Sequence, residues 1–445
     1  MQTTRQSDAL HADGYGPTEL GIQRTICTFV MSISSAFVSS DPGHPMSWDE
    51  LTLHTTSEQE RVQGPTNAQA KLRLFGHDPN SVRVTLFRDH HAWCPYCQKI
   101  WLWLEFKQIP YKIQKVTMRC YGPKEPWFLK KVPSGMLPAL ELNGELITES
   151  DVILLALEQQ FGPLGSAMTD SDSLELRHLE RLLFRAWCIW LCSPGLNLRQ
   201  QNQAKEQFRA VAKRFEQELN TTPGPWLRGD QPETVDLLFV PYVERMNASL
   251  AYYKGYRLRR EHPSIDRWFR ALESLATYRG TQSDMHTHVH DLPPQMGGCW
   301  SDNSELSTEL ATKIDCGDGL GDDEAVWPDE SLHGQAALAL SRVIRHRDQL
   351  LKRNPFGSQK FDLPLRCALT RLITGAACQP PNGSAASLRY LRDRISIPRD
   401  MPLPAGRLLR QALEATAAMD GPQQGEPLGL RNRFDQDPSA FLIRP

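Results

Sequence analysis

The sequence has little net charge, few cysteines and no long apolar run. Its 445 residues carry a formal charge of −2, which argues against bulk electrostatic binding to nucleic acid or to an anionic membrane. No apolar stretch reaches the roughly 18 residues that a transmembrane helix needs. Ten cysteines in a chain of this length are too sparse for a disulfide scaffold. With 40% hydrophobic and 23% charged residues, a folded chain of about three domains is expected.

The first 50 residues lack the composition of a targeting segment. They contain two basic residues against six acidic ones, whereas organellar transit peptides are usually rich in arginine and poor in acids. We therefore expect a reducing, cytoplasmic location, with a plastid as the alternative. In such a compartment a Cys-x-x-Cys pair is more often catalytic or metal-binding than structural.

Residue patterning divides the chain into six predicted segments. Residues 301–330 contain ten acids and one lysine, which favours a solvated linker there. The segments are a leader arm (1–80), an α/β domain (81–163), an all-α domain (164–292), an acidic flexible linker (293–330), a helical module of unknown role (331–420) and a tail (421–445).

The α/β domain is predicted to have the order β-α-β-α-β-β-α, with a hairpin across Asn143-Gly144. Apolar residues at three- and four-residue spacing predict the helices that follow. A short helix over Ser47–Arg61 is expected in the leader, with Ser47 as its cap. The later helices are predicted at Leu174–Leu191, Gln201–Leu219, Val235–Leu250, Ser264–Ala276, Gly334–Arg353, Leu363–Ala377, Ser384–Arg394 and Ala405–Met419.

One pair of cysteines, Cys94 and Cys97, has a spacing with chemical meaning. The pair follows a predicted strand and opens a predicted helix, with Pro95 at the first helical position. A cysteine at a helix N-terminus faces unpaired N–H groups and the positive end of the helix dipole, and both stabilise a thiolate. This context favours a redox or conjugating thiol over packed core thiols or a zinc half-site.

These motifs resemble those of a known family. The CPYC sequence resembles the glutaredoxin active site, and residues 131–141 (KVPSGMLPALE) with 147–151 (ITESD) resemble the thioredoxin-fold half of a glutathione transferase. Residues 225–230 (PWLRGD) with Val235-Asp236 are similar to its all-α half. The Cys-type site is similar to the omega, lambda, dehydroascorbate-reductase and iota classes. The flanking residues 64–75 (GPTNAQAKLRLF) and 397–405 (IPRDMPLPA) resemble segments of plant and algal iota-like members.

The resemblance implies roles for individual residues. Cys94 would be the nucleophile and Cys97 its resolving partner, with glutathione as cosubstrate. Leu137 and Pro138 would form the family's cis-proline site. The glutathione-binding set it implies is Tyr96, Lys124, Leu137, Pro138, Glu149 and Ser150. A simple helix cap without a ligand is the alternative for Glu149-Ser150.

Two further groups of residues have weaker patterns. Trp187 and Trp190 lie where the resembled fold borders its hydrophobic substrate site and could stack a ligand there, but a buried core stripe is the favoured alternative. The histidines of His286-Thr-His-Val-His290 could bind a metal. Because no partner cluster is evident, we predict a solvated loop there and no metal site.

The predicted function is a glutathione-dependent thiol transferase or oxidoreductase. Its reactions would be deglutathionylation, or reduction of dehydroascorbate or quinone adducts. The expected partners are glutathione and a small disulfide or electrophilic substrate; no nucleic acid and no membrane are expected, and a homodimer is left open. The alternative is a non-catalytic ligand- or protein-binding module with a transferase-like fold.

Overall fold

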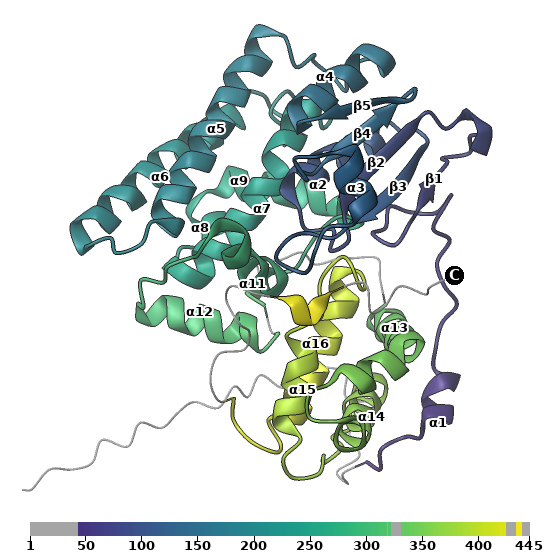
Figure 1. Cartoon of the computed structure of the whole chain (residues 1–445). Coiled ribbons are helices and arrows are strands. Elements are labelled where there is room, and N and C mark those ends of the chain that lie inside the picture. Colours follow the sequence, from purple (N-terminus) through teal and green to yellow (C-terminus); the bar gives the residue numbers. More distant parts are fainter. Residues whose placement is uncertain (1–42, 318, 322–330, 424–432, 438–445) are drawn as a thin grey trace, which may run out of the picture. The chain divides into compact units, whose positions relative to one another are not determined.

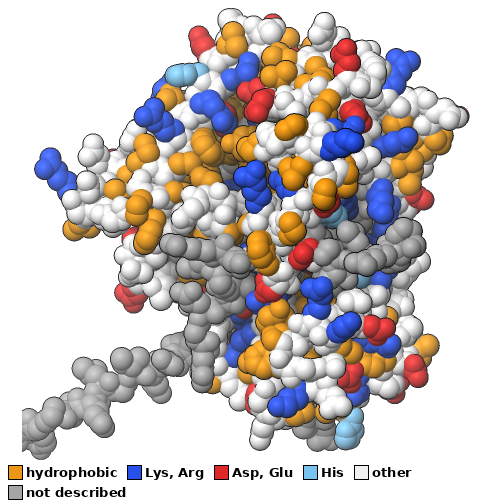
Figure 2. Space-filling view, viewed as in Figure 1, with side chains coloured by type: hydrophobic (Ala, Val, Ile, Leu, Met, Phe, Trp, Pro, Cys, Tyr) orange, Lys and Arg blue, Asp and Glu red, His pale blue; other side chains and the backbone are white. Residues whose placement is uncertain are grey.

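The computed structural model describes residues 43–317, 319–321, 331–423 and 433–437 (Figure 1). Lys and Arg side chains are interspersed with Asp and Glu on the face drawn in Figure 2, in keeping with the small net charge. None of the described helices combines the length and the apolar character that a membrane span requires.

A five-stranded sheet with the order β1-β3-β2-β4-β5 forms the α/β domain. Strands β2 and β3 are parallel, whereas β4 and β5 continue the sheet as an antiparallel hairpin. Helix α2 connects the parallel pair. The elements are β1 (Leu72–Arg73), β2 (Val84–Asp89), α2 (Pro95–Phe106), β3 (Tyr111–Val116), α3 (Pro126–Lys131), β4 (Ala139–Leu142), β5 (Glu145–Thr148) and α4 (Ser150–Phe161).

In the described residues after this sheet the regular elements are all helices, so the predicted fold class, α/β followed by all-α, is confirmed. Helix α7 packs against α2 and carries the all-α half onto the sheet domain. The helices are α5 (Ser171–Cys192), α6 (Leu198–Glu218), α7 (Thr234–Lys254), α8 (Leu258–Glu261), α9 (Pro263–Ser274), α10 (Ala276–Arg279), α11 (Met285–Met296) and α12 (Glu305–Asp315).

Four helices occur where the helical module was predicted, and they share a hydrophobic core of their own. They are α13 (Leu332–Arg353), α14 (Ser358–Thr374), α15 (Ala385–Arg392) and α16 (Leu403–Ala417). The domain boundaries themselves stay predictions.

Part of the predicted acidic linker is a packed helix. Helix α12 packs on α7 and buries Leu310 and Ile314. The expectation of an unpacked linker is therefore wrong for Glu305–Asp315, because apolar residues four apart outweigh the acidic composition there. The acidic stretch 322–330 lies outside the described residues.

The histidine segment also differs from its prediction. It lies in α11, capped by Asp284, whose side chain accepts from the Thr287 N–H at 3.0 Å. His286, His288 and His290 are all buried. The solvated-loop prediction is wrong because the alternation of His with Thr and Val masked a capped helix.

The described part of the leader packs against the C-terminal module. Helix α1 (Trp48–Leu53) begins with the predicted capping box of Ser47 and Glu50 but ends well before Arg61. Its Leu51 is completely buried in the module's core. The Trp48 indole donates to Asp362 at 2.7 Å, and the Met46 N–H donates to Thr370 at 2.9 Å.

The module also contacts the transferase-like half through a buried ion pair. Arg410 of α16 donates to the Asp284 carboxylate at 3.0 Å and to the Thr287 hydroxyl at 3.1 Å. Both charged side chains are buried. Removing one partner would leave the other charge buried and unpaired, so this contact fixes the module on α11.

Replacing Leu51 with alanine should destabilise the protein, because it leaves a cavity in the module's core. We expect a loss of about 2–5 kcal/mol in the free energy of unfolding. Leu53→Ala is the matched control: Leu53 lies on the same helix but is 84% exposed, so its loss should be near zero. Urea denaturation measures both. Equal effects would show that α1 does not pack on the module in solution.

Candidate active site

Cys94 lies at the junction between β2 and α2, as predicted. It is the N-cap residue of α2, and Pro95 occupies the first turn. Its Sγ is 4.0 Å from the Leu137 carbonyl oxygen. The residue is 7% exposed, so its sulfur lies just beneath the surface at the end of a twelve-residue helix. The helix N-terminus provides positive electrostatic potential at this position.

Cys97 lies one turn further into the helix and is buried. Burial raises the pKa of the Cys97 thiol, and the hydrogen bond it shares with Cys94 raises it further. At neutral pH Cys97 is therefore a protonated thiol that can donate to the Cys94 sulfur. The two positions are therefore chemically distinct: the Cys94 sulfur can act as the nucleophile, whereas Cys97 can act only after it has lost its proton.

Two residues that the sequence did not single out hold the loop before Cys94. The Trp93 N–H donates to Asp89 at 2.7 Å, at the end of β2. Arg245 of α7 donates to the Trp93 carbonyl, and its guanidinium lies 4.6 Å from the centroid of the Trp93 ring. An acid at a strand end was a visible signal for Asp89, whereas only the fold brings Arg245 to this loop.

Three residues near Cys94 could carry a positive charge that stabilises its thiolate, but each has another role in the structure. His91 stacks on Tyr121 with 3.4 Å between ring centroids, and burial lowers its pKa well below the ordinary value. Burial also lowers the pKa of His90 to about 4, so both imidazoles are neutral at pH 7. Lys99 is paired with Asp151 at 3.0 Å. These three residues therefore serve packing and ion pairing rather than the thiol.

The predicted cis-proline is present beside the thiol. The Leu137-Pro138 peptide bond is cis and leads into β4. Because the Leu137 carbonyl lies next to Cys94 Sγ, the backbone of this residue borders the sulfur. An extended peptide lying here could pair with that backbone as a strand would.

Glu149 and Ser150 begin α4. Glu149 adopts φ +67°, a left-handed conformation that is uncommon for a residue with a side chain. Its carboxylate is exposed and makes no capping bond to the first turn of α4, while Ser150 is buried. A strained backbone of this kind costs about 1–3 kcal/mol and is frequent at ligand sites.

Lys124 borders an open cavity of about 340 Å³, a size within the range of small-molecule sites. Its Nζ donates to the Thr117 carbonyl at 3.0 Å. Arg119 lines the same cavity, so two cations face it, and Phe434 from the C-terminal segment forms part of the wall. Arg119 and Phe434 were not predicted.

Tyr96 points away from the core and meets a cluster of aromatic residues. It is 36% exposed, and its ring meets Tyr242 edge-on at 5.8 Å. Phe184 lies against Tyr242 at 5.1 Å, and the partly exposed Arg181 covers both rings. These residues form an amphipathic surface next to the CPYC turn.

The tryptophans predicted at the substrate site lie in the core. Trp187 is 1% exposed and donates to the Ser249 hydroxyl at 3.0 Å. Trp190 is 3% exposed and packs between Phe208 and Tyr256. Their placement at a substrate site is thus corrected, because both rings face inward across α5 and present no surface to a ligand.

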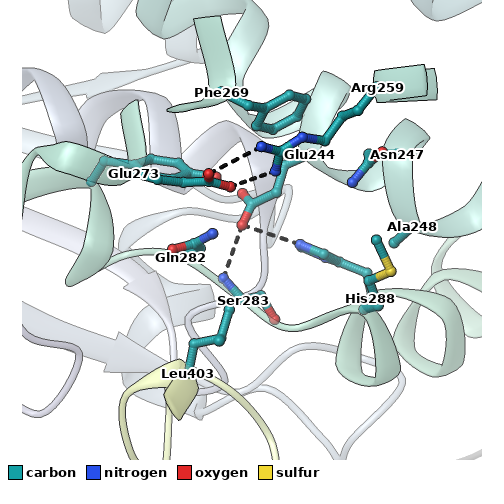
Figure 3. A pocket seen from close by; sticks show the side chains of 12 residues that line it. Glu244, Asn247, Ala248, Arg259, Phe269, Glu273, Gln282, Ser283, His288 and Leu403 are labelled. Carbon is teal, nitrogen blue, oxygen red and sulfur yellow. Dashed lines mark hydrogen bonds and ion pairs between the residues drawn. The ribbon is translucent and has the colours of Figure 1, made fainter. Parts of the chain in front are cut away.

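A second, smaller cavity of about 30 Å³ is lined by residues of α7, α9 and α11, among others (Figure 3). Glu244 accepts from the Ser283 N–H at 2.9 Å and faces His288 at 3.3 Å, while Arg259 is paired with Glu273. The cavity has room for about a single water molecule and is too small for a substrate, so we do not consider it a substrate-binding site.

Comparison with known proteins points to one family. Residues 93–160 match the family model of the glutathione S-transferase N-terminal domain. Glutathione S-transferase DHAR2 of Arabidopsis thaliana is 28% identical over 190 residues, which are 43% of this chain and 84% of the relative. Over these residues the chain is similar to the glutathione transferases. The predicted resemblance to the Cys-type members is thereby confirmed.

The chain is also similar to other proteins of this kind. Glutathione S-transferase L3 of Arabidopsis thaliana is 25% identical over 193 residues, which are 43% of this chain and 79% of the relative. Among solved structures, glutathione transferase Omega 3C from Trametes versicolor aligns with a TM-score of 0.39 at 23% identity, covering 53% of this chain and 94% of that one.

Alkylation should distinguish the two active-site sulfurs. Because burial raises the pKa of Cys97, its reaction with iodoacetamide at pH 7 should be slow, and Cys94 should be labelled first. Peptide mass spectrometry over a pH series measures both rates. In urea the rates should become similar. Preferential labelling of Cys97 in the folded protein would reverse the assignment.

Proposed function

We propose that this protein is a glutathione-dependent thiol transferase that acts through the Cys94 sulfur. The observation that carries the proposal is the placement of Cys94 at the N-terminus of α2, beside the Leu137 carbonyl, with the protonated thiol of Cys97 one turn behind it. The relationship to glutathione transferases and dehydroascorbate-reductase-type proteins supports glutathione as the cosubstrate.

The reaction begins when the Cys94 thiolate attacks the glutathionyl sulfur of a mixed disulfide. The new bond joins Cys94 to glutathione, and the substrate leaves as a thiolate that takes up a proton. A second glutathione thiolate then attacks the glutathione sulfur, giving oxidised glutathione and free Cys94. In a dithiol branch the Cys97 sulfur attacks the Cys94 sulfur instead, which breaks the Cys94–glutathione bond and releases glutathione; two further glutathione molecules then reduce the Cys94–Cys97 disulfide and leave as oxidised glutathione. Dehydroascorbate and quinone adducts are the related substrates of the proposal.

Glutathione would lie across the elements that surround the sulfur. Its cysteinyl backbone would pair with Leu137, next to the cis Pro138. Its γ-glutamyl amine suits the exposed Glu149 carboxylate, and its α-carboxylate suits Ser150 and the first N–H groups of α4. The glycyl carboxylate suits the cations of the Lys124 cavity.

The second substrate would lie on the opposite side of the sulfur. Tyr96, Phe184 and Arg181 form an aromatic and cationic surface there, which suits a planar or anionic substrate. A cytoplasmic location, with a plastid as its alternative, and a homodimer stay predictions of the sequence.

Cys94→Ser should lower glutathione-dependent reduction of hydroxyethyl disulfide by more than about 100-fold, because it removes the nucleophile. Cys97→Ser should keep the rate within about threefold, since Cys97 serves only the dithiol branch. Cys188→Ser, on α5, is the control and should match the parent. A Cys94→Ser protein with full activity would favour the alternative of a non-catalytic binding module.

Glu149→Ala and Lys124→Ala should raise the KM for glutathione by about tenfold each and change kcat by less than about threefold. Each removes a charge that would meet an end of glutathione far from the reacting sulfur. Glu145→Ala is the matched control, because Glu145 is an exposed glutamate on the neighbouring strand β5. Steady-state kinetics with varied glutathione measures these values, and an unchanged KM in both variants would contradict the assigned binding mode.

A further inference from the structure

Three helices bring a cluster of metal-ligating side chains together, away from the thiol site. Helix α11 carries His286 and His290 one turn apart, and α12 ends at Asp315. The ligand atoms of these three residues all lie within 4.8 Å of one another. Asp393, at the end of α15, lies next to His286, with 3.4 Å between its Oδ1 and His286 Nε2.

The spacing of these atoms approaches that of a tetrahedral zinc site. His290 Nε2 is 2.7 Å from Asp315 Oδ1, and His286 Nε2 is 3.4 Å from Asp393 Oδ1. Four ligands at zinc–ligand distances of about 2.0–2.1 Å stand about 3.3 Å apart along each edge of a tetrahedron. The ligand atoms of His286, His290 and Asp315 thus lie at distances that one ion could bridge, and Asp393, next to His286, is the candidate for the fourth ligand.

Both histidines are buried with an unsatisfied ring nitrogen. His286 is 3% and His290 4% exposed. His286 Nε2 and His290 Nδ1 each have no hydrogen-bond partner in the described part of the chain. A buried polar atom without a partner costs about 1–3 kcal/mol, so the unpartnered His286 Nε2, the atom that would bind the ion, calls for an explanation.

The charges around the cluster are compatible with a dication. Arg392 is paired with Asp393 at 2.7 Å and also with Glu414, and Arg410 is paired with Asp284. The two carboxylates of Asp315 and Asp393 would balance the charge of the ion. The Tyr252 hydroxyl donates to Asp315 Oδ2 at 3.1 Å, an outer contact of the kind that orients a ligating carboxylate.

We propose that His286, His290, Asp315 and Asp393 bind one zinc ion. Two imidazoles and two carboxylates are a nitrogen and oxygen set that suits zinc, whereas calcium and magnesium prefer oxygen alone. Four protein ligands leave no open position, which makes the site structural. Since Asp393 belongs to the C-terminal module, the ion ties that module to α11 and α12.

The test measures zinc in the full chain, in a Cys94→Ser/Cys97→Ser background that removes zinc binding by the CPYC thiols. The protein is exposed to excess zinc chloride during refolding and then desalted, and its metal content is determined by mass spectrometry. We expect one zinc ion per chain. Substitution with cobalt should give the visible bands of a tetrahedral ion without the near-ultraviolet band of thiolate ligands.

His286→Asn and His290→Asn should each lower the zinc content at least about tenfold. His288→Asn is the matched control: His288 is buried on the same helix but faces Glu244 (Figure 3), so this variant should keep the parent's zinc content. If the histidine variants do not fold, Asp393→Asn serves in their place. It should abolish the rise in Tm that zinc produces in the parent.

Several results would overturn the proposal. They are a parent chain that holds no zinc after refolding, a zinc content that is equal in the parent and in His286→Asn, a cobalt spectrum with thiolate bands, and a zinc-dependent Tm that survives Asp393→Asn. None of these depends on transferase activity, so the zinc site and the proposed function can fail separately.

Discussion

Helix α2 is buried from Cys97 to Glu105, and much of the structure follows from that constraint. A buried helix must find partners for each of its polar side chains. Gln98 donates to Glu244 at 2.9 Å and accepts from Arg245 at 3.0 Å, which draws α7 against the first turn. The same Arg245 holds the Trp93 carbonyl, so satisfying Gln98 also fixes the loop that carries Cys94.

The other end of α2 organises the segment before the sheet. Glu105 is buried and forms an ion pair with Arg73 at 2.9 Å. It also accepts from the Thr66 hydroxyl and from the Tyr111 hydroxyl, both at 2.7 Å. A buried carboxylate is tolerated only with this many partners. Residues 66–73 therefore lie against the domain, and β1 joins the edge of the sheet next to β3.

The helices and strands near Cys94 could be predicted from short sequence patterns. The features that the sequence analysis predicted wrongly or did not predict depend on tertiary contacts. Asn143-Gly144 has the turn chemistry of a hairpin, and a proline after Cys94 marks a helix start, so both were visible in the sequence. Trp187 and Trp190 show helical periodicity in either environment, and only the packing of α5 places them in the core. Helix α12 depends on its packing against α7, and the burial of Leu51 depends on residues hundreds of positions away. Composition and local periodicity contain no information about such contacts.

The buried contacts that begin at α2 continue into the C-terminal module. Glu244, the partner of Gln98, accepts from the Ser283 N–H, and the Ser283 hydroxyl donates to the Ile397 carbonyl. The Ile397 N–H in turn donates to the hydroxyl of Thr287, which belongs to α11, at 3.1 Å. Removing the module would leave Ser283, Thr287 and Asp284 without these partners in a buried region, at about 1–3 kcal/mol for each neutral group and more for the charge. The module is therefore part of the same folded unit that positions the thiol, and a chain cut before it would lose contacts that reach, through Glu244 and Gln98, to the first turn of the active-site helix.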